Sequence, residues 1–308
     1  MTTQLSKSPH HDTLVVMTRP TPYDGSPALF PSRDGDLAYL DTGPPQAGAA
    51  TPALVLLHPG WTDHTLWSEV VPLLAARHRV IAPDARGHGA SANASRPFRP
   101  CDDLAGLLRH LGTGPAALIG CSMGADTAVA TALEHPDLVR ALVLGGGGSG
   151  RNMELRTPWA VENAARQQAA LAAGDLSGWA EHFAHGAVGP QRQPGDLSPE
   201  LLDRIRTAGL RTLSKHTPDE PDHHIPVPDL AARAAALTVP VLAVNGALDV
   251  PELAAHARHV ADSAPWGRTV TLPDAGHFAP MERPGEFVEA VGEFLREAEA
   301  EAEAGRGR

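Results

Sequence analysis

Six short apolar runs recur along this chain, and helical patterns separate most of them. Each run is continuous rather than alternating, which is typical of strands that are buried on both faces of a parallel sheet. Strands that alternate with helices build βαβ units, so the pattern predicts an α/β fold. The predicted strands are Leu54–Leu57, Val80–Ala82, Ala116–Ile119, Ala141–Leu144, Val241–Val244 and Thr269–Leu272.

An earlier pair of short runs, Ala28–Phe30 and Leu37–Asp41, flanks a turn with the sequence Arg-Asp-Gly, which predicts an antiparallel hairpin at the edge of the sheet. The helical stretches predicted between and after the strands are Leu66–Ala76, Asp102–Leu111, Met123–Glu134, Glu252–Ala261 and Gly285–Glu297.

Residues 150–236 interrupt this rhythm, because they contain helical patterns such as Pro199–Ala208 but no convincing strand. Ser198 is a good N-cap for that helix, and Pro199 suits its first position. The segment therefore predicts a helical cap or lid inserted into a core of residues 23–149 and 237–298. It follows Ala141–Leu144, which is the sixth strand when the two strands of the hairpin are counted. We expect residues 1–22 to form a loose polar arm and residues 299–308 to form a frayed, solvated tail.

The charge balance and the hydropathy exclude several classes of function. With 36 acidic and 25 basic residues, the chain has a formal net charge of −11, which disfavours binding to nucleic acid. No apolar run approaches the roughly 20 residues of a membrane-spanning helix, and the N-terminus lacks the apolar segment of an export signal. We expect a cytoplasmic protein without a membrane partner, in which Cys101 and Cys121 are idle thiols rather than a disulfide.

The strongest chemical signal is the pentapeptide Gly-Cys-Ser-Met-Gly at residues 120–124. It matches G-x-S-x-G, follows a predicted strand and opens a predicted helix. Glycines two positions before and after Ser122 would relieve the crowding of such a sharp turn and expose the serine hydroxyl at the edge of the sheet. The pattern predicts that Ser122 is a nucleophile.

A serine needs a base to remove its proton, and the base needs a carboxylate to orient it. His277 lies on the loop between the last predicted strand and the final helix. Asp249 comes just after the strand before it, whereas the turn at 145–150 holds no acid, and Asp274 suits a turn residue. The predicted order is Ser122, Asp249 and His277, that is, nucleophile, acid and base.

Acyl transfer also needs hydrogen-bond donors for the oxyanion that develops in the transition state. The backbone N–H of Met123, at a helix start, is one expected donor. The second is expected from the loop His-Pro-Gly-Trp after the first core strand, where Pro59 has no N–H. Both Gly60 and Trp61 can donate, and Gly60 is the preferred donor.

At these residues the chain resembles the α/β-hydrolase family, over about Leu37–Gly148 and Leu237–Leu295. Two departures are the proline in the His-Pro-Gly motif, which blurs the choice of oxyanion donor, and Ala125 where many relatives have a third glycine. The motifs that carry the resemblance are His-Pro-Gly at 58–60, the charged turn 84–91, the Ser122 turn, Gly246 with Asp249, Gly276-His277 and Met-Glu-Arg-Pro at 281–284.

The resemblance implies that the turn 84–91 is structural, with charges that bond locally. It also implies a mostly parallel sheet flanked by helices. Because the predicted triad is complete and the sequence has no metal-ligand or dinucleotide spacing, we expect that no metal or organic cofactor is needed. The His-His pairs at 10–11 and 223–224 lack the spacing of metal ligands, and we interpret them as solvated loop residues.

The expected function is hydrolysis of a carboxylic ester, a thioester or a lactone of a small molecule. A cofactor-free haloperoxidase or a hydrolase of C–C bonds could use the same residues, and a non-catalytic ligand-binding protein on this fold is an alternative of another class. Residues expected to line the substrate pocket, although each could instead pack the core, are Trp61, Trp159, Trp179 and Phe183.

Overall fold

The computed structural model describes residues 26–45, 52–150 and 155–306, so the predicted arm 1–22 lies outside the described residues. In the described part, the strands form one eight-stranded mixed sheet. The strands are β1 (Ala28–Ser32), β2 (Gly35–Asp41), β3 (Leu54–Leu57), β4 (Val80–Pro83), β5 (Ala116–Cys121), β6 (Val139–Gly145), β7 (Val241–Gly246) and β8 (Gly267–Leu272). All six predicted core strands and the predicted hairpin are confirmed.

The strands lie in the order β1-β2-β4-β3-β5-β6-β7-β8. β1 and β2 pair antiparallel, as do β2 and β4, and every other pair is parallel. The register places Leu57 of β3 beside Gly120, and Cys121 beside Gly145. Strands β3, β5, β6, β7 and β8 therefore end together at one edge of the sheet, where ligands bind in folds of this class.

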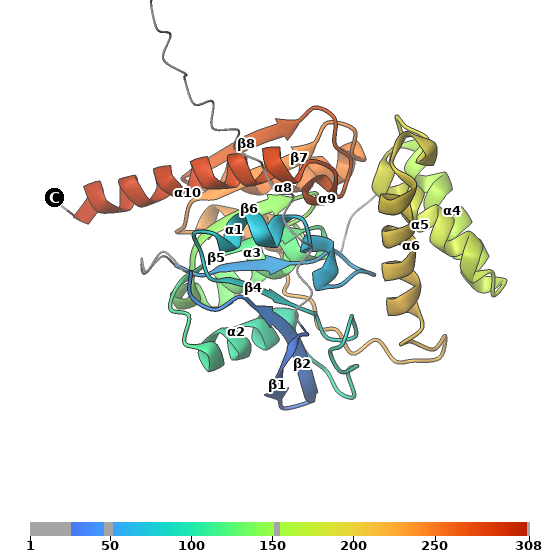
Figure 1. Ribbon diagram of the computed structural model, residues 1–308, viewed down its shortest axis with the longest axis horizontal. Helices are drawn as coiled ribbons and strands as arrows, with labels where there is room; N and C mark the ends of the chain where they lie inside the picture. The colour runs from blue at the N-terminus through green and yellow to red at the C-terminus, as the bar shows by residue number, and fades with distance from the viewer. Residues whose placement is uncertain (1–25, 46–51, 151–154, 307–308) are drawn as a thin grey trace, which may run out of the picture.

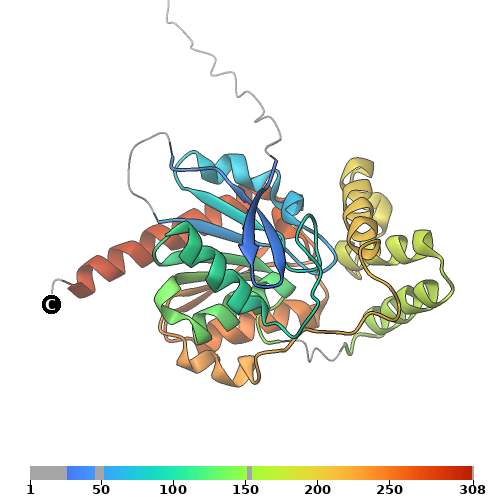
Figure 2. The same cartoon turned by 90° about the horizontal axis from the view of Figure 1, so that it is seen from below.

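Helices cover both faces of the sheet, as Figure 2 shows. One buried cluster packs α2 and α3 with α8 against the sheet, and a second packs α1 and α10 against the other face. These helices, with the short α9, are α1 (Val70–Ala75), α2 (Pro100–Leu111), α3 (Met123–Glu134), α8 (Pro251–Ser263), α9 (Ala279–Glu282) and α10 (Pro284–Arg306).

Two helices differ from their predicted bounds. The stretch predicted as one helix, Leu66–Ala76, is a 3₁₀ turn (His64–Trp67) followed by α1. Pro72 has no N–H to offer the carbonyl of Ser68, so one continuous helix cannot form there. The last helix continues to Arg306 rather than fraying from 299, because its Glu- and Ala-rich end consists of strong helix formers.

The segment between β6 and β7 is helical, as predicted, and stands beside the C-terminal edge of the sheet (Figure 1). Ser198 caps α6 by accepting a hydrogen bond from the N–H of Leu201 at 3.2 Å. We call residues 155–236 the insertion. Its elements are α4 (Pro158–Ala172), α5 (Leu176–Val188), α6 (Pro199–Leu213) and α7 (Leu230–Arg233), with 3₁₀ turns at Pro194–Asp196 and Ala234–Ala236.

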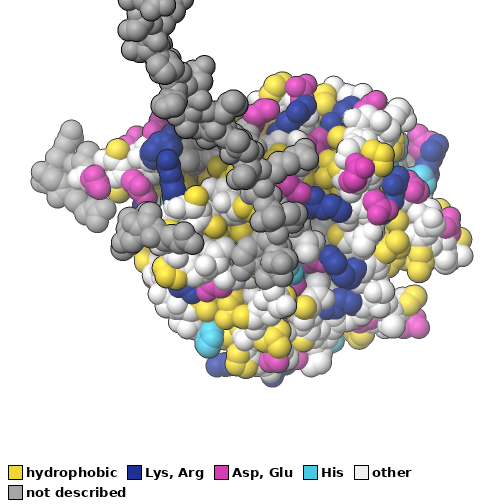
Figure 3. Space-filling view, in the orientation of Figure 1, with side chains coloured by type: hydrophobic (Ala, Val, Ile, Leu, Met, Phe, Trp, Pro, Cys, Tyr) yellow, Lys and Arg dark blue, Asp and Glu magenta, His cyan; other side chains and the backbone are white. Residues whose placement is uncertain are grey.

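The face of the molecule in Figure 3 carries basic and acidic side chains interspersed, without a broad field of one sign on its described part. Among the described residues, no helix combines the length and the apolar character needed to cross a membrane.

Candidate active site

Ser122 lies in the turn between β5 and α3. Its backbone has φ 52° and ψ −118°, a conformation that residues other than glycine rarely adopt. The N–H of Ser122 donates to the carbonyl of Gly145 at 2.7 Å, and its carbonyl accepts from the N–H of Ala125 at 2.8 Å. These bonds hold a sharp strand-to-helix turn with Ser122 at its apex.

The two glycines of this turn lie against neighbouring backbone. A Cβ on Gly120 would overlap the carbonyl of Gly124, and a Cβ on Gly124 would overlap the carbonyl of Leu57. Side chains at these positions would push α3 away from the ends of β3 and β5. The glycines thus allow the helix to begin directly behind Ser122, for the reason that the sequence pattern suggested.

His277 and Asp249 form a buried hydrogen-bonded pair. The Nδ1 atom of His277 lies 3.0 Å and 3.1 Å from the two carboxylate oxygens of Asp249. A carboxylate only accepts, so Nδ1 donates and Nε2 is left with a lone pair. Burial lowers the pKa of His277, but the charge of Asp249 and the hydrogen bond with it outweigh this effect, so the pKa stands above its ordinary 6.5.

Gly146, on the turn after β6, permits this pair to close. Its φ is 58°, and a Cβ there would stand 2.5 Å from Cε1 of His277 and 3.1 Å from Oδ2 of Asp249. In the sequence this turn contains no acid that could serve the proposed triad. Its run of four glycines was the signal that a close approach occurs here.

Ser122 and His277 line the same cavity, whose volume is about 770 Å³. The described residues show no hydrogen bond between the two side chains. Bonds of this kind are commonly long without substrate and tighten when it binds. The structure thus brings the three predicted residues to one edge of the sheet, with the serine and the histidine facing a common space.

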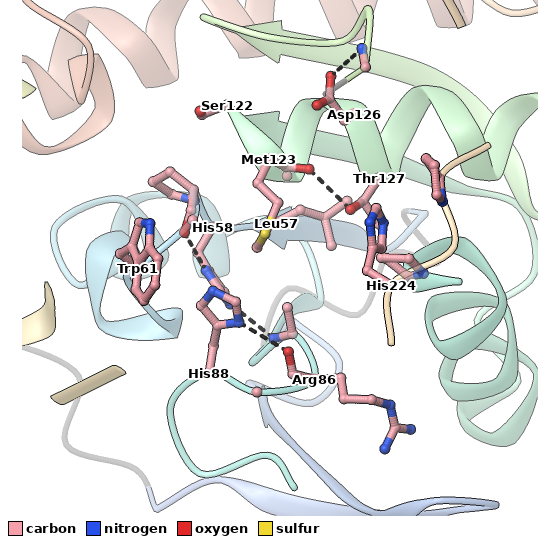
Figure 4. Close-up of a pocket in the computed structure, with 18 of the residues that line it drawn as sticks. Leu57, His58, Trp61, Arg86, His88, Ser122, Met123, Asp126, Thr127 and His224 are labelled. Atoms are coloured by element: carbon pink, nitrogen blue, oxygen red, sulfur yellow. Dashed lines mark hydrogen bonds between the residues drawn. The ribbon is translucent and has the colours of Figure 1, made fainter. Parts of the chain in front are cut away.

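The loop after β3 lies next to the start of α3. Figure 4 shows Trp61 and His58 on one side of the Met123 side chain. The ring of His58 is buried and accepts a hydrogen bond at Nε2 from the N–H of Ala85 at 2.9 Å. Its Nδ1 lies 2.8 Å from the carbonyl oxygen of Pro59. His58 is therefore occupied in holding this loop in place.

The three predicted oxyanion donors are close together. A Cβ on Gly60 would stand 3.9 Å from the Cβ of Met123, and Trp61 has a positive φ of 62°. Within the described residues, the N–H groups of Gly60 and Trp61 donate to no protein acceptor. Met123 is the first residue of α3, where an N–H has no partner inside the helix.

Three of the four predicted substrate residues line the cavity, namely Trp61, Trp159 and Phe183. Trp179 does not. It is 2% exposed and packs between Trp61 and Phe183, with ring centroids 5.4 Å and 5.3 Å away. Gly209 of α6 explains this burial, because a Cβ there would stand 3.0 Å from the ring of Trp179, so α6 closes over the indole.

The turn 84–91 is held by local bonds, as expected. Asp84 accepts from the N–H groups of His64 and Ala90, both at 2.8 Å. His88, however, also lines the cavity, and burial lowers its pKa to about 3, so the ring is neutral. The pair at 223–224 borders the cavity as well and is half-buried, which corrects its interpretation as purely solvated; His10 and His11 lie outside the described residues.

Two clusters in the described residues have the donor types of a metal site: Asp63, His64 and Asp84, and Cys101, Asp102 and His135. In the first, Asp63 pairs with an arginine and Asp84 lies 2.8 Å from the ring of His64. In the second, Asp102 lies 2.7 Å from an arginine and 2.8 Å from the ring of His135. Protein partners thus already engage these carboxylates.

Both cysteines are free and buried. The Sγ of Cys121 donates to the backbone carbonyl of His277 at 3.4 Å. Burial raises the pKa of both thiols, to about 11 for Cys101, so neither is a ready nucleophile.

The chain is similar to known proteins in sequence and in structure. The model of the alpha/beta hydrolase fold family matches residues 52–284. The chain is 26% identical over 277 residues to the sn-1-specific diacylglycerol lipase ABHD11 of Mus musculus, covering 80% of this chain and 82% of that protein. It is also 42% identical over 106 residues to the magnesium-chelatase 30 kDa subunit of Rhodobacter capsulatus, but this match covers only 36% of that subunit.

Solved structures agree with the family match. A thermophilic esterase from Thermogutta terrifontis superposes with a TM-score of 0.69 and 27% identity, covering 89% of this chain and 99% of the esterase. An enol-lactonase from Burkholderia xenovorans superposes with a TM-score of 0.67 and 25% identity, covering 87% and 100%. The chain belongs to the alpha/beta hydrolase fold family. The proteins that it resembles include a lipase, an esterase and an enol-lactonase.

Proposed function

We propose that this protein is a serine hydrolase that cleaves a carboxylic ester, a thioester or a lactone of a small molecule through an acyl-enzyme on Ser122. One observation carries the proposal. The turn holds Ser122 at a positive φ, facing the same cavity as His277, and Asp249 holds the Nδ1 of that histidine. The esterase and lactonase relatives support the reaction class.

In this mechanism the Ser122 hydroxyl attacks the carbonyl carbon, and Nε2 of His277 takes its proton. Asp249 keeps the imidazole in the required tautomer and stabilises the imidazolium. The N–H of Met123, with one from the adjacent pair Gly60 and Trp61, stabilises the oxyanion. His277 then protonates the leaving group and later activates the water that releases the acyl group.

The insertion is proposed to act as a lid over this chemistry. Trp159 and Phe183, from α4 and α5, line the same cavity as Ser122, where they would enclose an acyl chain. Apolar atoms make up most of the exposed cavity wall, beside Asp126, Glu220 and several histidines, so we assign the cavity to uncharged acyl groups of modest size.

A fluorophosphonate probe tests the proposal. The wild-type protein should be labelled on Ser122 and should hydrolyse p-nitrophenyl esters or lactones, whereas Ser122→Ala should lose both properties. Hydrolysis retained by a folded Ser122→Ala protein would reject it. Assays with acetate and peroxide, and with ring-fission dienoates, distinguish the haloperoxidase and C–C hydrolase alternatives that use the same residues.

A further inference from the structure

The end of α5 in the insertion lies between the two core loops that carry Asp249 and His277. The backbone N–H of His277 donates to the carbonyl of Ala187, in the last turn of α5, at 3.0 Å. On the other side, a Cβ on Gly189 would overlap the carbonyl of Leu248, which directly precedes Asp249. Gly189 has φ 97°, so only glycine allows the helix to end in this position without strain.

An ion pair ties the same helix end to the core. An Nη of Arg192, just after α5, lies 2.8 Å from the carboxylate of Glu282 in α9, and the two side chains are 13% and 3% exposed. The same guanidinium donates to the carbonyl of Val188 at 2.7 Å. Glu282 in turn accepts from the N–H of Gly276 at 2.9 Å. A continuous chain of contacts thus runs from α5 to the residue before His277.

These contacts fix the backbone on both sides of the peptide bond between Gly276 and His277. Glu282 bonds to Gly276, and Ala187 bonds to His277. Both contacts depend on the insertion, because Ala187 belongs to it and Glu282 pairs with its Arg192. A catalytic imidazole displaced by about 1 Å can lose roughly 100-fold in rate. Removing one partner of a buried ion pair also leaves an uncompensated charge, which favours rearrangement.

We propose that Arg192 and Glu282 are positioning residues that align His277, so that the insertion completes the catalytic geometry of the core and does not only shape the substrate pocket. The inference rests on the proposed function, in which His277 is the base. Glu282 of the 281–284 motif thus has Arg192 as its partner, although no local sequence pattern connects the two residues.

The charges around His277 agree with this assignment. Asp249, after β7, contacts the ring of His277, and the thiol of Cys121 donates to the backbone carbonyl of His277. Glu282 from α9 accepts from the N–H of the preceding residue, and Arg192 from the insertion pairs with Glu282. After Asp249, the negative charge of Glu282 also raises the pKa of His277. Burial raises the pKa of Glu282 itself, and Arg192 opposes that effect, so the arginine favours the charged carboxylate.

The experiment compares Arg192→Gln and Glu282→Gln with Arg204→Gln. Arg204 of α6 makes another ion pair between the insertion and the core, with Glu69, and serves as the control for a more exposed pair across the same boundary. kcat and KM are measured on p-nitrophenyl acetate and p-nitrophenyl octanoate, with circular dichroism to confirm the fold. We expect kcat to fall about 10- to 100-fold in both test variants, equally for both esters and with little change in KM. The control should stay within about twofold.

Two further readouts separate alignment from general loosening. The double variant should lose about as much as either single variant, because the pair acts as one unit. In Glu282→Gln the acidic limb of the kcat/KM profile should move to lower pH, since the negative charge that raises the pKa of His277 is gone. Arg192→Lys keeps the positive charge but not the planar guanidinium with its several N–H donors. Its kcat should therefore lie between those of Arg192→Gln and the wild type.

A folded Arg192→Gln protein with wild-type kcat overturns the inference. A variant in which KM rises and kcat is unchanged also overturns it, because that is the effect of losing a residue of the substrate pocket. If Arg192→Gln does not fold, Glu282→Gln removes the other partner of the same ion pair, and wild-type kcat in that folded variant overturns the inference as well. The proposed function is judged separately: if Ser122→Ala abolishes hydrolysis while the Arg192 variants keep kcat, the serine mechanism stands and the positioning role is rejected.

Discussion

Gly146 and Gly112 have nearly the same positive φ, 58° and 57°, but different surroundings. A Cβ on Gly146 would stand 2.5 Å from Cε1 of His277, whereas a Cβ on Gly112 would meet nothing within 4 Å. Both positions therefore carry the cost of a positive φ, but only Gly146 lies against the proposed base.

Gly146→Ala should lower kcat/KM about 100-fold, because the methyl group would displace the imidazole from its hydrogen bond with Asp249. Gly112→Ala should reduce the free energy of unfolding by about 1–2 kcal/mol and leave kcat/KM unchanged. Ester hydrolysis and urea denaturation of both variants provide the measurement. Equal kinetic losses at the two positions would mean that strain, rather than contact, limits the site.

Asp249→Asn should keep the fold but leave the imidazole in the wrong tautomer, with a loss in kcat that could approach about 10⁴-fold. Asp274→Asn is the control, because Asp274 lies only three residues before His277 but its carboxylate is exposed and pairs with Arg283. Steady-state kinetics on one ester suffice. If Asp249→Asn keeps near-full activity while Asp274→Asn loses it, then Asp274 and not Asp249 is the acid that orients His277.

The rate should depend on pH through His277, which must be neutral to take the proton from Ser122. Its pKa is raised above 6.5, so kcat/KM should be full above the raised pKa and fall as the pH decreases through it. The midpoint of this acidic limb should lie above that of an ordinary histidine. A midpoint below 6.5 would show that burial outweighs the charge of Asp249.

Trp159 and Trp179 should behave differently, since only Trp159 lines the cavity. Trp159→Ala should change kcat/KM unequally for acetyl, butyryl and octanoyl esters, by about 10-fold or more for the chain that it contacts. Trp179→Ala should reduce the free energy of unfolding by about 3–5 kcal/mol, because it removes a buried indole. Uniform losses over all chain lengths in a folded Trp159→Ala protein would contradict the proposed role of the lid.

The strands and the three proposed catalytic residues could be predicted because each is encoded locally. A continuous apolar run marks a buried strand, and Ser122, Asp249 and His277 each follow or lie just beyond such a run. The break before α1 was also encoded, in Pro72, but the apolar pattern on both sides outweighed it in the prediction.

The remaining features depend on contacts between distant segments. Trp159 and Trp179 both lie on helices of the insertion, and only the packing of α6 decides which of them is buried. Likewise, nothing near Glu282 in the sequence indicates that Arg192 reaches it from the insertion. Side-chain partners of this kind are set by tertiary structure and have no local pattern.

The positive φ of Ser122 implies a conflict between function and resistance to heat. A strained backbone of this kind costs about 1–3 kcal/mol, and glycine would adopt it freely. Ser122→Gly should therefore raise the melting temperature while it removes the proposed nucleophile. Laboratory evolution that selected only for a higher melting temperature would therefore favour inactive variants with glycine at position 122. A selection for stability in this protein has to include catalytic turnover.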